Sequence, residues 1–318
     1  MNAPQQQGGE RRQRIVPNIW CNANAEEAGR FYAEAFERAT AEVESRYPTE
    51  GLLEFQKPFA GEPLTVELTI DGYLFRLINA GDQFRPGPAL SFMLNFDPLR
   101  FDGDEERARA SLDRLWERLL DGGTALMPLA AYPFSAHYGW VQDRYGVNWQ
   151  LMLTDPAGEP RPFVIPALMF DGLAQDRAAE AADFYTTLFA SVLQDSGGTA
   201  IGTRFPYPAP SGKAAAGALA FGEFRLGDQW FVGNDNGSGV DHGFSCGVSL
   251  EVQCHGQEEI DFLWQALSAV PEAEQCGWLV DSFGVNWQIV PDNIAELMQR
   301  PGAFEHMLEM KKLVIPDF

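Results

Sequence analysis

The chain has 318 residues, a length typical of two domains that each bury a hydrophobic core. Its 45 acidic and 23 basic residues give a formal net charge of -22, which repels polyanions and argues against nucleic acid or an anionic membrane as a partner. Hydrophobic residues make up 45% of the chain, well above the level found in disordered proteins, so we expect a folded globular protein.

The chain shows no sequence signal for a membrane span or for secretion. The longest stretch without Asp, Glu, Lys or Arg, residues 122–142, contains Pro128, Pro133 and His137, which together do not suit a bilayer. Residues 1–12 contain no apolar segment of the secretory kind, and we therefore expect a cytoplasmic protein. The four cysteines lack CxxC spacing, which predicts reduced thiols that pack as small hydrophobic groups.

Hydrophobic periodicity predicts the elements of the first half in chain order. A helix is expected to begin near residue 25, because apolar residues recur at helical spacing from Ala28 to Ala35 and Asn24 with Glu27 forms a capping-box pattern. A second helix with the same apolar stripe is expected around Leu112 to Leu119. Strands are expected near residues 15–20, 41–47, 64–70, 73–79, 89–96, 124–128, 137–143 and 148–153.

The second half repeats these segments in the same order. The helix sequence SLDRLWERL (Ser111 to Leu119) is matched by EIDFLWQAL (Glu259 to Leu267), and GWVQDRYGVNWQLM (Gly139 to Met152) by GWLVDSFGVNWQIV (Gly277 to Val290). This repeat predicts two homologous domains associated within the chain as a pseudo-dimer. The expected limits are an N-terminal disordered tail (1–14), domain 1 (15–155), a linker (156–162), domain 2 (163–292) and a C-terminal helix and tail (293–318).

The paired segments, above all the closing GW-x₂-DxxGVxWQ signature, resemble the PhnB-like group of the vicinal oxygen chelate superfamily, often labelled 3-demethylubiquinone-9 3-methyltransferase-like. The resemblance implies an α+β fold of tandem glyoxalase-like domains, each with two βαβββ modules forming a curved mixed sheet. It also implies a ligand site inside each cup-shaped sheet. Enzymes of the superfamily place His, Glu and Gln metal ligands on the first and last strands of the modules.

The residues at those positions make a metal site unfavourable. Gln150 and Gln288 stand where metal-binding relatives carry Glu, and Asn18 is the one polar side chain of the first strand. Neutral amides are weak ligands for divalent ions, so we expect neither a metal nor another cofactor. Because Asn148 and Gln150, like Asn286 and Gln288, share a strand face, these four amides are candidate cup-lining groups for a small organic ligand.

Three charged or titratable residues are further candidates, each with a structural alternative. His137 begins a strand that is expected to line the first cup. Glu67 on an alternating strand is a candidate general base or a solvated side chain, and Arg76 is a candidate clamp for a ligand carboxylate in one cup only. The repeated aspartates Asp143 and Asp281 suit the first position of a type I turn, which explains them without catalysis.

Two classes of function remain open. The first is a metal-independent protein that binds a small organic molecule in its cups. The second is an enzyme of the superfamily type, either a metal-assisted lyase or dioxygenase or the methyltransferase of the family label, although the chain lacks the Gly-rich turn of a Rossmann-type methyltransferase. Residues 194–217, rich in Gly, Ser, Pro and Ala, are expected to form a mobile lid or an unstructured excursion of the second cup.

Overall fold

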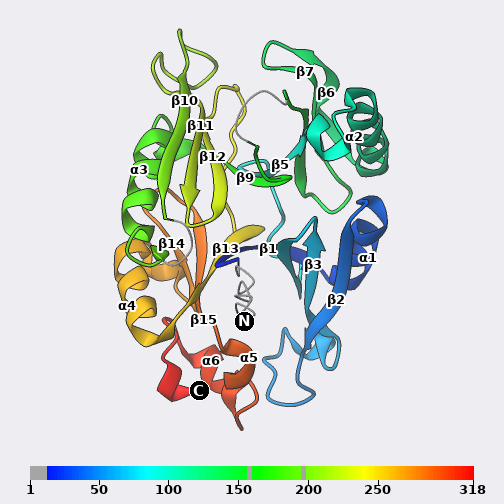
Figure 1. Cartoon of the computed structure of the whole chain (residues 1–318). Helices are drawn as coiled ribbons and strands as arrows, with labels where there is room; N and C mark the ends of the chain where they lie inside the picture. Colours follow the sequence, from blue (N-terminus) through cyan, green and yellow to red (C-terminus); the bar gives the residue numbers. More distant parts are fainter. Residues whose placement is uncertain (1–12, 156–159, 195–197) are drawn as a thin grey trace, which may run out of the picture.

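The chain contains four successive units, and each unit consists of strands and one long helix (Figure 1). The structure, a computed structural model, describes residues 13–155, 160–194 and 198–318. The first half contains, in order, β1 (Ile15–Asn22), α1 (Ala25–Ala35), β2 (Ala39–Arg46), β3 (Pro63–Ile70), β4 (Tyr73–Ala80), β5 (Leu90–Phe96), α2 (Glu105–Leu120), β6 (Thr124–Tyr132), β7 (Ser135–Gln142) and β8 (Asn148–Leu153). All eight strands expected in this half are present.

The second half repeats this order with one change. It contains β9 (Val164–Phe170), α3 (Ala178–Phe189), β10 (Ala200–Pro206), β11 (Leu219–Leu226), β12 (Gln229–Asp235), β13 (Val248–Cys254), α4 (Gly256–Leu267), β14 (Trp278–Val280) and β15 (Asn286–Pro291). Between α4 and β14 the described residues form a short 3-10 turn, η5 (Pro271–Ala273), where the other units have a strand. The short helices α5 (Ile294–Leu297) and α6 (Ala303–Glu309) follow. The backbone N–H groups of Cys276 and Gly277 donate to carbonyls of the C-terminal segment, so that segment protects the edge beside β14.

Each sheet combines strands from both halves of the chain. The seven-stranded sheet has the order β14-β15-β13-β1-β4-β3-β2, and the eight-stranded sheet has the order β10-β11-β12-β9-β5-β8-β7-β6. The α+β class and the tandem repeat are thus as predicted, but the two units that share a sheet come from different domains. Their inner strands pair antiparallel, β1 with β13 and β5 with β9. The two halves therefore associate within the chain through both sheets, in equivalent contacts as a pseudo-two-fold axis requires.

Helices cover one face of each sheet. Helices α1 and α4 pack on the seven-stranded sheet, α2 and α3 pack on the eight-stranded sheet, and Figure 1 shows the four helices on the outer sides of the molecule with the inner strands between them. The core between helices and sheets contains Trp149 and Trp287, both fully buried, and the apolar helix stripes predicted from the sequence. No helix in the described part of the chain is long and apolar enough to cross a membrane.

A buried carboxylate ties the last strand of each half to a helix. Asp143 accepts hydrogen bonds from the Tyr32 hydroxyl (2.7 Å), the Trp149 indole N–H (2.8 Å) and the backbone N–H groups of Tyr145 and Val147 (2.9 and 3.0 Å). Burial raises the pKa of the Asp143 carboxyl, and these donors oppose that rise. The turn function expected for this aspartate is confirmed, with an additional link to α1.

The second half contains the same arrangement. Asp281 accepts from the Tyr185 hydroxyl (2.6 Å), from the Trp287 indole (2.8 Å) and from two backbone N–H groups of its own turn. The repetition of the whole set in two copies indicates that it is a requirement of the fold.

The helix cap expected at the start of α1 is wrong. Asn24 makes no side-chain cap hydrogen bond. Instead, the Ala25 N–H donates to Asn79 Oδ1 (3.1 Å) from the end of β4, and in the second half the Ala178 N–H donates to Asp235 Oδ1 (3.0 Å). A parallel strand delivers the side chain to the helix N-terminus, a contact between distant residues that a local pattern does not predict.

The stretch expected to be an excursion, residues 194–217, is partly regular. Residues 200–206 form β10, which pairs with β11, so the expectation of an unstructured segment is wrong there. Lys213 is anchored through an ion pair to Asp171 (2.9 Å), which also accepts from Asn236 Nδ2 and from the His242 N–H. Residues 195–197, like 1–12 of the expected tail and 156–159 of the expected linker, lie outside the described residues.

We predict that Asp143→Ala lowers the free energy of unfolding by about 3 kcal/mol, because it leaves buried hydroxyl, indole and backbone donors without an acceptor. Tyr32→Phe removes only one of these bonds and serves as the graded control, with an expected loss of about 1 kcal/mol. Urea denaturation of both variants measures the difference. Equal losses would contradict the central position of the carboxylate.

We predict that Asp171→Asn destabilises the protein by about 2 kcal/mol at neutral pH and by less in acid. Burial raises the pKa of Asp171, but the hydrogen bonds from the His242 backbone, Lys213 and Asn236 outweigh it and hold that pKa well below its usual value. A carboxyl with a lowered folded-state pKa contributes stability that is full above the unfolded pKa of about 3.9 and is lost as the pH falls towards the folded pKa. Urea denaturation should show a smaller difference in the free energy of unfolding between parent and variant at pH 3 than at pH 7. An equal difference at both pH values would contradict the prediction.

Candidate functional site

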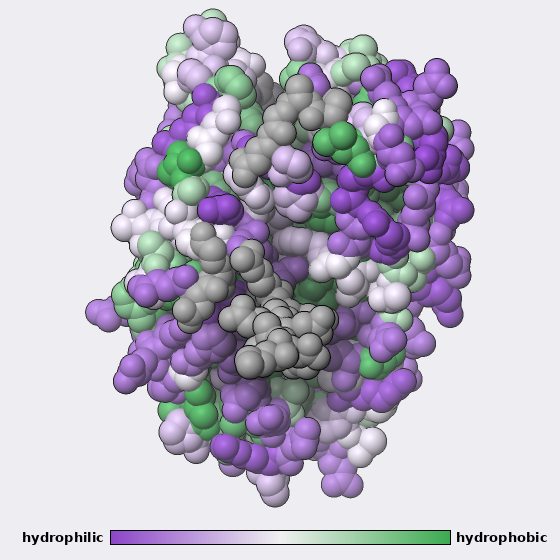
Figure 2. Space-filling view, viewed as in Figure 1, coloured by the Kyte–Doolittle hydropathy of each residue, from purple (hydrophilic) through white to green (hydrophobic). Residues whose placement is uncertain are grey.

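The faces of the two sheets that carry no helix are the candidate sites. Along β8, Trp149 and Leu151 point into the helix-covered core, whereas Gln150 and Met152 are half-buried on the opposite face. We call this helix-free face of the eight-stranded sheet the apolar cup, and the helix-free face of the seven-stranded sheet the polar cup. Figure 2 shows a notch in the surface at the top of the molecule. The lobe on one side of the notch contains β10 and β11, and the lobe on the other side contains β6 and β7.

The polar cup contains an arginine held by two carboxylates. Arg76 on β4 donates from Nε and Nη2 to the two oxygens of Glu44 on β2 (2.7 and 2.8 Å) and from Nη1 to Glu251 on β13. Burial lowers the pKa of Arg76, but Glu251 and Glu44 outweigh it and raise that pKa, so the guanidinium remains charged. Arg76 is therefore occupied by groups of the protein itself, in contrast to the ligand clamp considered from the sequence.

Amides from both halves complete the polar cup. Asn18 on β1 donates to Glu251 (3.2 Å), and its Oδ1 is buried without a hydrogen-bond partner among the described residues. Gln288 on β15 donates to Ser249 Oγ on β13 (2.9 Å). Glu67 lies beside Arg76 in the register of β3 and β4 but is exposed, which agrees with the solvated alternative.

The apolar cup has a hydrophobic floor made by both halves. Four buried side chains form it, and partly buried Met152, Phe221 and Trp230 pack against them. These four residues are Met93, Ile165, Ala167 and Val232. Met93 and Ile165 are register partners across the β5–β9 pairing, so the floor exists only because the two halves share this sheet.

A short chain of hydrogen bonds crosses this floor. The Tyr138 hydroxyl on β7 donates to Gln150 Oε1 (2.7 Å), and Gln150 Nε2 donates to Ser91 Oγ on β5 (2.8 Å). Burial raises the pKa of Tyr138, which keeps the hydroxyl protonated as a donor. The amide of Gln150 is therefore fixed in orientation, with its oxygen towards Tyr138.

An arginine from the connection between the halves lies beside the apolar cup. The Arg161 guanidinium stacks 4.0 Å from the ring centroid of Trp230 and forms a two-point ion pair with Glu223 on β11 (2.8 and 3.1 Å). Sequence reasoning did not select Arg161 or Trp230, because only the fold brings the connection next to β11 and β12.

His137 does not line a cup. It lies on β7 one position from Tyr138, on the face covered by α2, where its Nδ1 bonds Arg109 (3.1 Å) and its Nε2 bonds Asp113 (2.5 Å). The expectation that His137 faces the first cup is therefore wrong. His137 shares its face with Val141, which belongs to the helix-covered core, because alternate residues of a strand point to the same side.

The remaining amide candidates mainly bond within their turns. Asn148 donates to the Gly146 carbonyl (2.9 Å), and its buried Oδ1 has no hydrogen-bond partner among the described residues. Asn286 donates to the Gly284 carbonyl (3.3 Å) and accepts from the Cys246 thiol (3.1 Å). These asparagines belong to the turn before the last strand more than to a cup floor.

The structure thus regroups the sequence candidates. Asn18 and Arg76 of the first domain lie in the same cup as Gln288 of the second domain, while Gln150 lies in the other cup. Of the groups that sequence reasoning did not select, the serines carried a signal. Ser91 and Ser249 occupy the second position of the equivalent strands β5 and β13, so a serine recurs at the same place in both halves.

Metal ligands do not cluster in the described part of the chain. No group of three or more His, Cys, Asp or Glu side chains in residues 13–155, 160–194 and 198–318 is arranged to hold a metal ion. The four cysteines are unpaired, and burial raises the pKa of Cys21 to about 12, which keeps that thiol protonated.

Comparison with solved structures finds chains that match about half of this chain and chains that match most of it. A PhnB protein from Bacillus cereus is 30% identical, covers 45% of this chain and 100% of its own, and has a TM-score of 0.37. Protein PA1353 from Pseudomonas aeruginosa is 22% identical over 45% of this chain and 98% of its own, with a TM-score of 0.35. Glyoxalase I from Zea mays is 12% identical over 89% of this chain and 95% of its own, with a TM-score of 0.49.

Family assignment rests on the sequence match. Among curated proteins, none matches the chain. The family described as 3-demethylubiquinone-9 3-methyltransferase matches twice, over residues 13–152 and 162–290, which together make up most of the chain. The chain therefore belongs to this PhnB-like family of the vicinal oxygen chelate superfamily, in a form that carries two copies of the family domain.

Proposed function

We propose that the protein binds a small, partly apolar organic molecule in the apolar cup and that it does so without a metal ion. The observation that carries the proposal is the chain from Ser91 through Gln150 to Tyr138, which lies next to a hydrophobic floor. A mostly apolar surface with a few fixed polar groups is the usual composition of a site for a small organic ligand.

The amide of Gln150 has hydrogen-bonding capacity left for such a ligand. Its oxygen accepts one bond from Tyr138 and its nitrogen donates one bond to Ser91, whereas an amide offers two acceptor sites and two donors. Gln150 is half-buried, so part of its side chain is accessible from the cup. Neighbouring Trp230 and Phe221 are also half-buried and supply aromatic surface for the apolar part of the ligand.

The charges near both cups support binding without a metal. In the polar cup, Arg76 is ion-paired with both Glu44 and Glu251, which weakens the attraction of these carboxylates for a cation. In the apolar cup, Glu223 is ion-paired with Arg161. A neutral amide such as Gln150 is a weak ligand for a divalent ion on its own.

The free cysteines support the localisation of the protein in a reducing compartment. All four cysteines are unpaired, and reducing conditions such as those of the cytoplasm keep thiols in this state. We extend the proposal accordingly to a cytoplasmic binding protein.

We predict that Gln150→Ala abolishes or strongly reduces the thermal stabilisation that a broad panel of small organic molecules gives the parent protein. The matched control is Gln288→Ala, the equivalent position in the polar cup, which should keep the parent profile. Each substitution alone should cost about 1 kcal/mol of stability, so both variants remain folded. A thermal-shift screen makes the measurement, and an unchanged profile for Gln150→Ala would exclude the apolar cup as the site.

We also predict that protein purified without chelator carries no stoichiometric transition metal, as measured by inductively coupled plasma analysis. Gln150→Glu and Gln288→Glu should raise the affinity for divalent cations only slightly, because carboxylates of the same cups, Glu223 and Glu251, are already ion-paired with Arg161 and Arg76. Tight metal retention by the parent would support the metal-assisted enzyme instead.

The methyltransferase alternative has its own test. Isothermal titration with S-adenosylmethionine should give no binding to the parent protein, because the proposal requires no such cofactor. Binding that Gln150→Ala abolishes would place the cofactor in the apolar cup and replace our proposal with the methyltransferase.

A further inference from the structure

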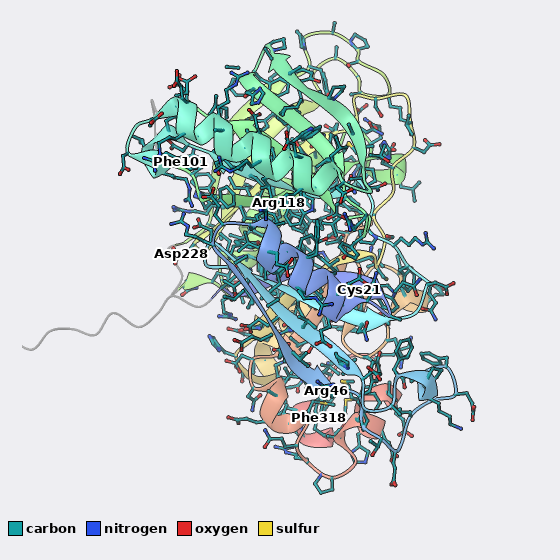
Figure 3. The ribbon with its side chains drawn as sticks, turned by 90° about the vertical axis from the view of Figure 1, so that its right-hand side faces the viewer. Cys21, Arg46, Phe101, Arg118, Asp228 and Phe318 are labelled. Atoms are coloured by element: carbon teal, nitrogen blue, oxygen red, sulfur yellow. The ribbon has the colours of Figure 1, made fainter. Side chains whose placement is uncertain are left out.

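A cavity lies outside both cups, between the helices of the first half. It has a volume of about 380 Å³ and is bounded by the end of α1, the turn between β3 and β4, and the first part of α2. Figure 3 shows α2 and α1 next to each other, with Phe101 near the start of α2 and Arg118 between the two helices. Phe101 is one of the residues that line the cavity. The volume is in the range that holds a small organic molecule.

The cavity is rich in arginine although the protein is strongly acidic. Its lining includes four arginines but only two carboxylates, Glu37 and Asp71, in a chain with a net charge of -22. These arginines are Arg38, Arg100, Arg107 and Arg114. A local excess of positive charge in a concave site attracts anions even when the whole protein repels them.

The arginines keep donors for a ligand. Arg38 and Arg100 bind Asp71, Arg114 binds Glu37 at 2.8 Å, and Arg107 binds Asp102 outside the cavity at 3.1 Å. Each of these ion pairs uses one nitrogen of its guanidinium, which has five N–H donors in a geometry that suits carboxylate and phosphate oxygens. Asp71 and Glu37 therefore orient the arginines without using up their donors.

Apolar groups form the rest of the lining. Phe36, Phe96, Phe101 and Phe163 contribute aromatic surface, and Ile70 and Leu115 contribute aliphatic surface. Arg100 lies 5.0 Å from the ring centroid of Phe163 and so joins the charged part to the aromatic part. The cavity thus has one basic and one apolar side.

The internal repeat shows that the fold does not require these charges. In the second half, Ser191 stands at the position of Arg38 and Phe262 at that of Arg114, as read from the ungapped matches of α1 with α3 and α2 with α4. The apolar positions are kept, since Phe36 corresponds to Phe189. The same architecture therefore forms without basic residues at these two positions.

We propose that this cavity is a binding site for a small organic anion that carries a phosphate or carboxylate group on a compact apolar body. The oxyanion lies among the guanidinium groups of Arg38, Arg107 and Arg114, and the apolar body lies against Phe36 and Phe101. The site is separate from the apolar cup and does not depend on the function proposed for it.

Calorimetric titration with phenyl phosphate, benzoate and inorganic phosphate tests the site. We expect phenyl phosphate or benzoate to bind. Inorganic phosphate should bind at least 10-fold more weakly because it lacks the apolar body. The tighter of the two organic probes identifies whether the natural anion carries a phosphate or a carboxylate group. The double variant Arg38→Gln/Arg114→Gln should weaken binding at least 10-fold. Both side chains are exposed and their surface ion pairs contribute little to stability, so the variant remains folded.

The control is Arg30→Gln, which removes one positive charge, half of that lost in the double variant, from an exposed position of α1 outside the cavity. It should leave the affinity within twofold of the parent, and Gln150→Ala in the cup should do the same. No binding of any of the three probes at 10 mM would overturn the proposal. Binding that the double variant retains, or that Arg30→Gln weakens equally, would also overturn it, because general charge would then explain the affinity.

Discussion

The antiparallel pairing of inner strands from different halves, β1 with β13 and β5 with β9, is the contact on which the rest of the structure depends. β5, β9 and β13 are buried along their whole length, so these strands need neighbours on both edges and cover on both faces. Each half alone would leave two such edges open. Pairing them within one chain satisfies the backbone groups and joins the halves into two continuous sheets.

This exchange also determines the chemistry of the cups, because each cup takes side chains from both halves. The seven-stranded sheet unites Arg76 of the first half with Glu251 of the second, and the result is a charged network that is internally paired. The eight-stranded sheet unites Met93 with Ile165, and the result is a hydrophobic floor. Two domains of common origin thus form two cups of opposite character, which is why the proposed ligand site is assigned to one of them.

The repeat separates what the fold requires from what is specific to one half. The bonds of Asp143 and Asp281 to a tyrosine and a tryptophan occur in both halves and connect the last strand to a helix. Arg38 and Arg114 beside α1 and α2 have no basic counterpart in the other half, and Arg161 comes from the connection between the two halves. The arginine-lined cavity uses groups present in one copy, whereas the proposed ligand site in the apolar cup also uses Gln150 and Ser91, which Gln288 and Ser249 match in the other half.

The sequence by itself determined the family, the α+β class, the repeat and all eight strands of the first half, because these depend on local periodicity and on short motifs such as DRYG and DSFG. It also placed Gln150 on the face opposite Trp149, since alternation along a strand is local. Only the tertiary structure decided which strands share a sheet, that His137 faces α2, and that Asn79 instead of Asn24 caps α1. Those features depend on strand register and on contacts between residues far apart in the chain, for which a single sequence carries no local signal.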